Sequence, residues 1–244
     1  MNIDVQQSVR EVALNIPAAT RVFEKLGIDY CCGGGKSLEQ ACGAAHLQLQ
    51  RVIDLLSAAK LAEEVRQGPA AIDWTTAPLA DLIHHIKNTH HAYTRDEIVR
   101  LGPLFEKVCR VHGDQHPELN EIHIKFESLA RELTTHMRKE EFVLFPYIER
   151  LERAVIGSEP VAQAPFGTVQ NPVAMMQHEH AEAANLLRGM RSLSDGYKPP
   201  AQACTSYRTL YEALAEFERD LHQHIHLENN ILFLRAITME RTSQ

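Results

Sequence analysis

The chain has 244 residues, of which 44% are hydrophobic and 23% are charged, which is the composition of an ordinary globular protein. A net charge of −7 without a basic patch argues against nucleic acid as the main partner. No apolar run approaches the ~18 residues of a membrane span, and the N-terminus lacks the apolar core of a signal peptide. These features predict a cytoplasmic protein that binds neither nucleic acid nor a membrane.

Residues 1–66 are predicted to form a small helical domain. Spaced apolar residues over 5–26 indicate helix, interrupted at Pro17 and ended by Gly27. Ser37, followed three residues later by a glutamine, predicts the start of further helix that extends to residue 65 with a break near Gly43. Residues 67–77, which contain the only tryptophan, are the expected linker to a second domain.

A glycine-rich stretch without helical character separates these helices. It reads Asp29-Tyr30-Cys31-Cys32-Gly33-Gly34-Gly35. A glycine-flanked cysteine pair near a helix start is expected to be exposed and to have a lowered thiol pKa, which suits transient metal or small-ligand chemistry. The alternative is that both cysteines are buried as small hydrophobic residues. With five cysteines in an irregular set, a secreted disulfide framework is not expected.

Residues 78–244 carry the periodicity of four long helices and no convincing strand. The helices are expected over about 78–111, 117–153, 171–193 and 201–238. The predicted fold class is therefore all-α, with an antiparallel four-helix bundle as the second domain.

Two segments of the bundle repeat the pattern His-x-x-x-Glu-x-x-(Val/Ile)-Leu-Phe. One starts at His136 and includes Glu140, and the other starts at His224 and includes Glu228. Four residues make about one helical turn, so each histidine shares a face with its glutamate. Such a set of nitrogen and oxygen ligands suits iron, manganese or zinc, and a carboxylate can bridge two ions.

Periodicity also indicates which histidines face the bundle interior. Residues seven apart lie on nearly the same face, so an inward histidine should have apolar neighbours at that spacing. One histidine in each predicted helix is favoured by this test, namely His91, His136, His180 and His224. His84 shares the face of His91, and its role stays open. Neighbouring histidines such as His178, His222 and His226 have polar residues or arginine at that spacing.

Six such ligands exceed the needs of one ion. A catalytic zinc site uses about three protein ligands and a water. Two octahedral irons that share the two carboxylates and an oxo group would use all four imidazoles. We therefore expect an oxo-bridged pair of iron ions. No cysteine lies at an inward position, which argues against an iron–sulfur cluster in the bundle.

These motifs together resemble the di-iron proteins that repair iron–sulfur clusters, the repair-of-iron-centres family. The resemblance rests on the cysteine stretch and on three bundle motifs, and it covers nearly the whole chain. The motifs are His136-x-x-x-Glu140, Gln177-His178-Glu179-His180 and His224-x-x-x-Glu228-Asn229-Asn230. It implies a cysteine-bearing N-terminal domain followed by a haemerythrin-like bundle. It also implies that His91, His136, His180 and His224 bind iron and that Glu140 and Glu228 bridge, with His90 the competitor of His91.

The resemblance further implies a function in nitrosative or oxidative stress. The protein would restore damaged iron–sulfur clusters by binding nitric oxide, by donating iron, or by both, with apo or damaged iron–sulfur proteins as partners. Cys31 and Cys32 would act in that chemistry. Whether the chain forms a homodimer is left open.

Two further functions compete with cluster repair. One is a nitric-oxide reductase that forms N₂O at the di-iron site, and the other is a carrier or sensor that binds NO or O₂ reversibly. The cysteine pair argues against a simple carrier, which has no evident need for it. A ferritin-like oxidase is disfavoured because its Glu-x-x-His spacing is absent from the repeat.

Overall fold

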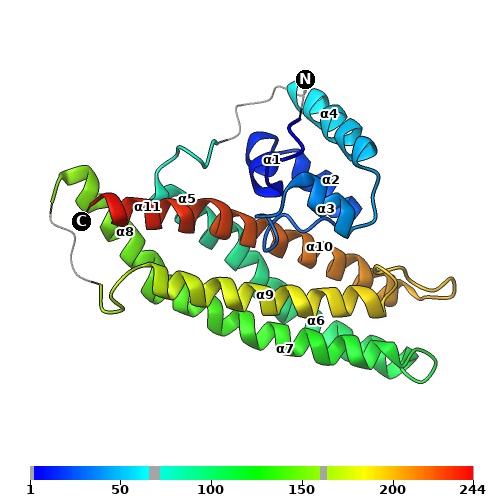
Figure 1. Ribbon diagram of the computed structural model, residues 1–244. Helices are drawn as coiled ribbons and strands as arrows, with labels where there is room; N and C mark the ends of the chain where they lie inside the picture. The colour runs from blue at the N-terminus through cyan, green and yellow to red at the C-terminus, as the bar shows by residue number, and fades with distance from the viewer. Residues whose placement is uncertain (1–2, 66–71, 160–163, 244) are drawn as a thin grey trace.

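A computed structural model describes residues 3–65, 72–159 and 164–243. In these ranges the chain forms helices and turns, with two isolated bridges and no β-strand, so the predicted all-α class is confirmed. A group of short helices, the N-terminal unit, lies on a bundle of long ones (Figure 1).

The N-terminal unit begins with matched helix starts. Ser8 and Ser37 each accept a hydrogen bond from the backbone three residues on, and their backbones form an isolated bridge. Gly27 ends the second helix with a φ of 68°, a left-handed conformation that favours glycine. The unit has its own apolar core, which includes Phe23 and Leu56. Its helices are α1 (Val9–Asn15), α2 (Ala19–Leu26), α3 (Leu38–Ala44) and α4 (Leu49–Val65).

The bundle consists of four helical rods, three of which are interrupted by a π-helical turn. The predicted helices were continuous, so these turns are a difference from expectation. The first rod is α5 (Leu79–His85), η1 (Ile86–His91) and α6 (Ala92–His112). The second is α7 (Glu118–Lys139), η2 (Glu140–Leu144) and α8 (Phe145–Gly157). The third is α9 (Gln170–Leu193), and the fourth is α10 (Thr205–Leu227), η3 (Glu228–Leu232) and α11 (Phe233–Thr242).

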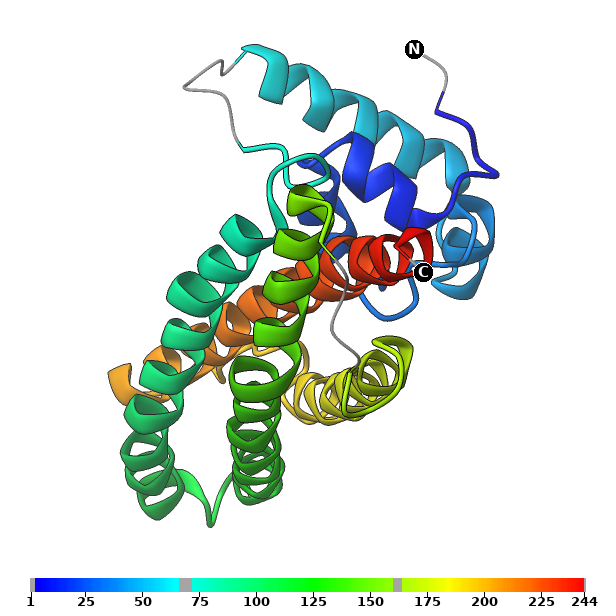
Figure 2. The same ribbon diagram turned by 90° about the vertical axis from the view of Figure 1, so that its left-hand side faces the viewer.

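Apolar side chains fill the bundle in two separate clusters. One lies among α6, α7, α9 and α10 and includes Phe105 and Phe217. The other lies among α5, α8, α9 and α11 and includes Phe145 and Phe233. Each fully buried large side chain contributes roughly 1.5–3 kcal/mol, so both ends of the bundle are well packed. In both Figure 1 and Figure 2 the N-terminal unit lies against the fourth rod, which crosses the first two rods in the second view.

Two buried glutamates from distant helices hold the starts of other helices. Glu152 in α8 accepts hydrogen bonds from the backbone amides of Leu79 and Ala80, at 2.6 and 2.9 Å. Glu240 in α11 accepts from the amide of Val169 at 3.0 Å and from the hydroxyl of Thr168 at 2.5 Å. A carboxylate at a helix N-terminus satisfies free amides and complements the helix dipole. These contacts fix the ends of α5 and α9.

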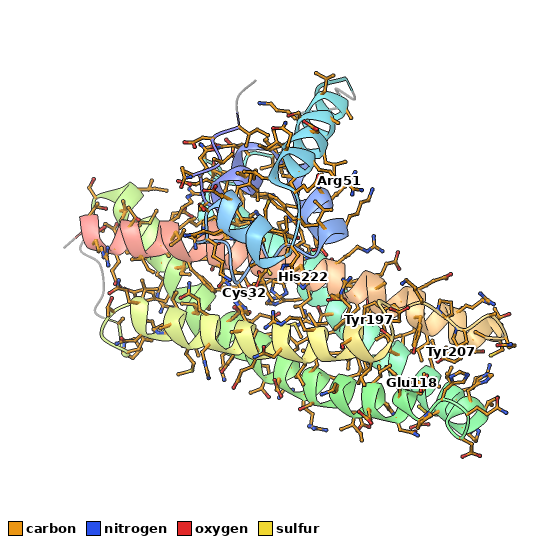
Figure 3. All side chains as sticks on the ribbon, turned by 45° about the vertical axis from the view of Figure 1, so that its right-hand side comes forward. Cys32, Arg51, Glu118, Tyr197, Tyr207 and His222 are labelled. Carbon is orange, nitrogen blue, oxygen red and sulfur yellow. The ribbon has the colours of Figure 1, made fainter. Side chains whose placement is uncertain are left out.

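The N-terminal unit contacts the bundle on the third and fourth rods, and side chains of the fourth rod form its shortest hydrogen bonds. Figure 3 shows Cys32 and His222 where the two parts meet. The His222 ring donates to Glu24 of α2 at 2.9 Å, and Asn230 donates to the carbonyl of Tyr30, also at 2.9 Å. Of the linker predicted at 67–77, residues 67–71 lie outside the described part.

Candidate metal centre

The six residues proposed as metal ligands meet in one buried pocket at the level of the π-helical turns. None is more than 2% exposed. The Nε2 atoms of His91 and His224 lie 3.1 Å apart, and those of His136 and His180 lie 3.0 Å apart. The full set is His91, His136, Glu140, His180, His224 and Glu228.

The two carboxylates lie between the two histidine pairs. Glu140 Oε2 is 3.4 Å from His91 and 3.3 Å from His136. Glu228 places Oε1 2.9 Å from His224 and Oε2 3.2 Å from His180. Each half of the pocket therefore offers two nitrogens and shares both carboxylates, which is the arrangement needed to hold two ions with bridging glutamates.

The pocket fits a pair of metal ions because its polar atoms lack other partners. Both carboxylate oxygens of Glu140 and Oε2 of Glu228 are buried and accept no hydrogen bond. Buried carboxylates without a hydrogen bond or a cation are strongly disfavoured. Two nitrogens bound at right angles to one ion lie roughly 3.0 Å apart when each bond is about 2.1 Å, close to the spacing of both pairs.

The electrostatics of the pocket favour positive charge. Burial opposes the charged imidazole, but Glu140 and Glu228 raise the pKa of His91 to about 10. Burial likewise opposes charge on His136, whose pKa is nevertheless raised to about 10 by Glu140 and Glu179. Burial opposes ionisation of Glu228, yet the nearby imidazoles of His224, His180 and His91 hold its pKa well below the usual range. The two carboxylates therefore favour positive charge in this pocket, which a bound metal ion would supply.

Three of the four imidazoles are oriented by a hydrogen bond at the ring nitrogen that faces away from the pocket. His91 Nδ1 donates to Glu141 at 2.7 Å, and Glu141 also accepts from Arg95 at 2.8 Å. His136 Nδ1 donates to Glu179 at 2.8 Å, and Lys139 donates to the same carboxylate. Such contacts set which nitrogen faces a metal and raise its basicity.

The third oriented imidazole is His180, whose Nδ1 donates to Asn229 Oδ1 at 3.0 Å. His224 Nδ1 is buried and has no hydrogen-bond partner. The sequence reasoning assigned no role to Glu141, Glu179 or Asn229. The sequence feature that could have identified them is their position, because each residue is adjacent in sequence to a proposed ligand.

The ligand group excludes His90, the competitor of His91, and also the neighbouring histidines His178 and His226. His90 is buried, but its Nδ1 donates to Asp220 at 2.9 Å and its ring stacks on His224. His226 accepts a hydrogen bond from Asn230 at 2.8 Å and meets the ring of Tyr30, so it faces the N-terminal unit. His178 is exposed and lies 3.4 Å from a carboxylate oxygen of its own helix.

A cavity of about 340 Å³ opens beside one half of the pocket, between α7 and α9. Its lining includes His136 and His180, together with Leu133, Lys139 and Glu179. A small molecule in this cavity would contact two of the proposed ligands directly.

The cysteine pair lies against the bundle and not in solvent. Cys31 is 4% exposed, Cys32 is half-buried, and their Sγ atoms are 4.0 Å apart without a disulfide. Cys32 Sγ lies 3.7 Å from the backbone oxygen of His180, and Asn229 donates to the carbonyl of Cys31 at 3.4 Å.

The expectation of exposed thiols with lowered pKa values was wrong for Cys31. Its contact with Cys32 and its burial raise the pKa of the Cys31 thiol well above the usual range. The physical reason is that Cys31 packs into the apolar cluster of the bundle, which periodicity within the N-terminal unit does not reveal.

Two domain families match this chain. Residues 81–236 match the hemerythrin HHE cation binding domain, and residues 5–60 match ScdA_N, a domain of unknown function. No helix in the described residues is long and apolar enough to cross a membrane.

Several bacterial proteins resemble the chain over nearly its whole length. It is 36% identical over 235 residues to the iron-sulfur cluster repair protein YtfE of Musicola paradisiaca, a match that covers 96% of this chain and 98% of the relative. It is 36% identical over 234 residues to the protein of the same name from Pectobacterium carotovorum, with the same coverage. It is 37% identical over 234 residues to that from Escherichia coli O157:H7, again with the same coverage.

Proposed function

This chain belongs to the family of iron-sulfur cluster repair proteins named YtfE, and from that membership we propose that it restores damaged iron–sulfur clusters in other proteins. The observation that carries the proposal is the buried pocket of four imidazoles and two shared carboxylates. The pocket has ligands for two ions and lies beside a pair of thiols, and both features suit a protein that handles iron. The proposed location is the cytoplasm, where damaged iron–sulfur proteins would be its partners.

We assign the resident group as two oxo-bridged iron ions. His91 and His224 would hold one ion, His136 and His180 the other, and the two glutamates would bridge them. When bound, this group supplies redox-active iron that binds NO or O₂ and that can be given up to an apo-protein.

The chain's own residues orient the ligands and exclude water. Hydrogen bonds at Nδ1 turn the Nε2 atoms of His91, His136 and His180 toward the pocket. The ring of Phe145 stacks on His91, and that of Phe233 stacks on His180. These aromatic rings pack against the two imidazoles, which fixes the imidazole orientation and keeps water away from the packed faces.

Cys31 and Cys32 are assigned to the repair chemistry itself. Their segment contacts His180 from outside the pocket, so the thiols lie between the ligands and solvent. We accordingly divide the chain into a cysteine-bearing domain at 1–66, a linker at 67–77 and a haemerythrin-like domain at 78–244.

The test combines metal analysis with a repair assay. Purified chain should contain two irons and should restore activity to an enzyme whose cluster has been destroyed by nitric oxide or peroxide. Glu140→Gln should lower the iron content and abolish repair, because the bridge loses its charge. Glu212→Gln, an exposed position on α10, is the control and should change neither. Repair by a metal-free chain at the rate of the loaded one would contradict the proposal.

A nitric-oxide reductase is the second candidate. The cavity lined by His136 and His180 favours it, because NO could enter there and reach the ion that these two residues would hold. Repeated turnover of NO to N₂O would support the reductase, whereas binding without turnover would support repair or carriage alone. The double substitution Cys31→Ser with Cys32→Ser should spare NO binding and abolish repair, and intact repair would contradict the role of the thiols.

A further inference from the structure

We propose that Asp29, Cys31 and Cys32 form a second metal site, for one divalent ion that binds thiolates, such as ferrous iron, where the N-terminal unit meets the bundle. One ligand atom from each of the three residues lies within 4.8 Å of the others. The site is separate from the pocket in the bundle, with which it shares no ligand.

Two of the three spacings among these side chains match the edges of a tetrahedral site, and the third lies within 4.8 Å. The two Sγ atoms lie 4.0 Å apart, and Cys31 Sγ lies 3.5 Å from Asp29 Oδ1. With metal–sulfur bonds of about 2.3 Å and metal–oxygen bonds of about 2.1 Å, tetrahedral edges are roughly 3.8 Å between sulfurs and roughly 3.6 Å between sulfur and oxygen. Little rearrangement is needed for all three to bind one ion.

The backbone holds this arrangement before any ion binds. Asp29 Oδ1 accepts hydrogen bonds from the amides of Cys32 and Gly33, both at 2.9 Å, so the carboxylate is fixed beside the thiols. Gly34 has its own constraint, because a Cβ there would lie 2.6 Å from the carbonyl oxygen of Tyr30. The tight turn therefore presents both cysteines on the side that faces the bundle.

The charges of the cluster favour a cation. The contact with Cys32, burial and the nearby Asp29 carboxylate raise the pKa of the Cys31 thiol, in part because three anionic groups would lie close together. A divalent ion removes this repulsion, and it displaces the thiol protons as it binds. Arg188 lies 4.0 Å from Oδ2 of Asp29, the oxygen that does not contact the Cys31 thiol.

The site has one side toward solvent and one side toward the bundle pocket. Asp29 is exposed and Cys32 is half-buried, so the fourth position of a tetrahedral ion is open to water or to a thiol of another protein. On the inner side, Cys32 Sγ lies 3.7 Å from the carbonyl oxygen of His180, whose ring is one of the proposed ligands. An ion here would lie between the pocket and a partner.

This position makes the site a transfer port for iron, an assignment that rests on the proposed repair function. Transfer from this site to a partner is ligand exchange without change of oxidation state, and iron from the oxo-bridged pair would reach the site after one-electron reduction by a cellular thiol or a reduced electron carrier. The ferrous ion binds to both sulfurs and the carboxylate, the thiol protons pass to water, and a thiol of the recipient takes the open position. The chain's thiols regain protons when the ion leaves.

The test is an anaerobic titration of full-length chain that already holds two irons. Cobalt(II) is the probe, because thiolate ligation gives sulfur-to-cobalt charge-transfer absorption and tetrahedral geometry gives intense visible bands. Free thiols are counted first, with a phosphine reductant present. One further equivalent of cobalt should bind with both signatures. Asp29→Asn should weaken its binding by about tenfold or more, and Cys31→Ser with Cys32→Ser should abolish it.

Cys204→Ser is the matched control, because this thiol is exposed on the far part of the bundle, and the extra equivalent should remain. Retention of two irons shows that each variant is folded. The port is overturned if native chain binds no further cobalt, or if the double variant still binds it. Failure of the port leaves two irons and repair intact, whereas failure of the proposed function appears as loss of repair in native chain.

Discussion

Asn229 connects the metal pocket to the cysteine segment, residues 29–34, through a single side-chain amide. Its oxygen accepts from His180 Nδ1 and its nitrogen donates to the carbonyl of Cys31. The first contact selects the form of His180 whose Nε2 is free to bind a metal. The second contact ties the orientation of that ring to the position of the cysteine segment.

Asn229→Ala should therefore disturb both parts at once. Loss of the acceptor should lower metal affinity by roughly 10–100-fold, as for other contacts that orient a ligand. Chelator competition measures this, and hydrogen exchange should show faster exchange over residues 29–34. Asn185→Ala, an exposed change on the helix that carries His180, should alter neither. Unchanged metal affinity in Asn229→Ala would show that His180 needs no such contact.

Single-helix periodicity identified the inward histidines well but missed contacts between elements. His136 and His224 were found because apolar residues lie seven positions away, and this spacing reports one face of one helix. His90 and His226 are also buried. His90 is hydrogen-bonded to Asp220, and His226 packs against Tyr30 of the N-terminal unit. Cys31 is buried for the same kind of reason, because its cover comes from another part of the chain.

The π-helical turns are the main feature of the elements that the sequence does not predict. Turn η1 ends at His91, η2 begins at Glu140 and η3 begins at Glu228. A π turn adds one residue to a helix without changing its composition, so the apolar pattern still indicates continuous helix. Helix positions were predicted to within a few residues, whereas the local geometry that presents each ligand was not.

Glu240 of α11 accepts hydrogen bonds at the start of α9, and its contribution to stability depends on pH. Burial opposes its charge, but hydrogen bonds from Thr168, Tyr147 and Val169 lower its pKa. A carboxylate with a lowered folded-state pKa stabilises the fold above the ordinary value of 4.5, and this contribution is lost as pH falls through the lowered pKa.

Glu240→Gln should accordingly cost about 1–3 kcal/mol near neutral pH, as for other hydrogen bonds to a buried charge. The difference in melting temperature from native chain should shrink as pH falls from 6 to 3. Thermal unfolding followed by circular dichroism measures both variants, and Glu212→Gln serves as the exposed control. A difference that is constant over this pH range would mean that the charge of Glu240 contributes nothing.

Gly34, which ends the cysteine segment, and the next residue, Gly35, should respond differently to substitution by alanine. A Cβ on Gly34 would lie 2.6 Å from the oxygen of Tyr30, whereas a Cβ on Gly35 would meet nothing within 4 Å. Gly34→Ala must move the backbone of Tyr30, which accepts from Asn230, and should destabilise the segment by about 1–3 kcal/mol. Hydrogen exchange over residues 29–34 should rise for Gly34→Ala and stay constant for Gly35→Ala. Equal exchange in the two variants would contradict the proposed constraint.

Across the whole molecule, the N-terminal unit is held to the fourth rod by a few specific polar contacts. The pair of Glu24 and His222 is one of them, and the opposing charge of Glu24 raises the pKa of His222 against the effect of burial. The sequence predicted both helical parts, but contacts of this kind join residues about 200 positions apart and leave no periodic signal.

Glu24→Gln should loosen this attachment without emptying the bundle pocket. Loss of the charged partner leaves His222 with a weaker acceptor, so limited proteolysis after α2 should accelerate while two irons are retained. Glu106→Gln, an exposed change on α6, is the control. If Glu24→Gln instead lost iron, the pocket would depend on docking of the N-terminal unit.

The six ionisable ligands form a polar layer between two apolar clusters, and this separation governs how the molecule would respond to losing its ions. Each end keeps its own packing, whereas the polar layer is left with imidazoles and with buried carboxylates whose charge only protons can neutralise. Chelation should thus soften the centre of the bundle first and leave two helical ends that melt independently. Bound ions would then act as a crosslink that joins the two halves of the bundle into one cooperative unit.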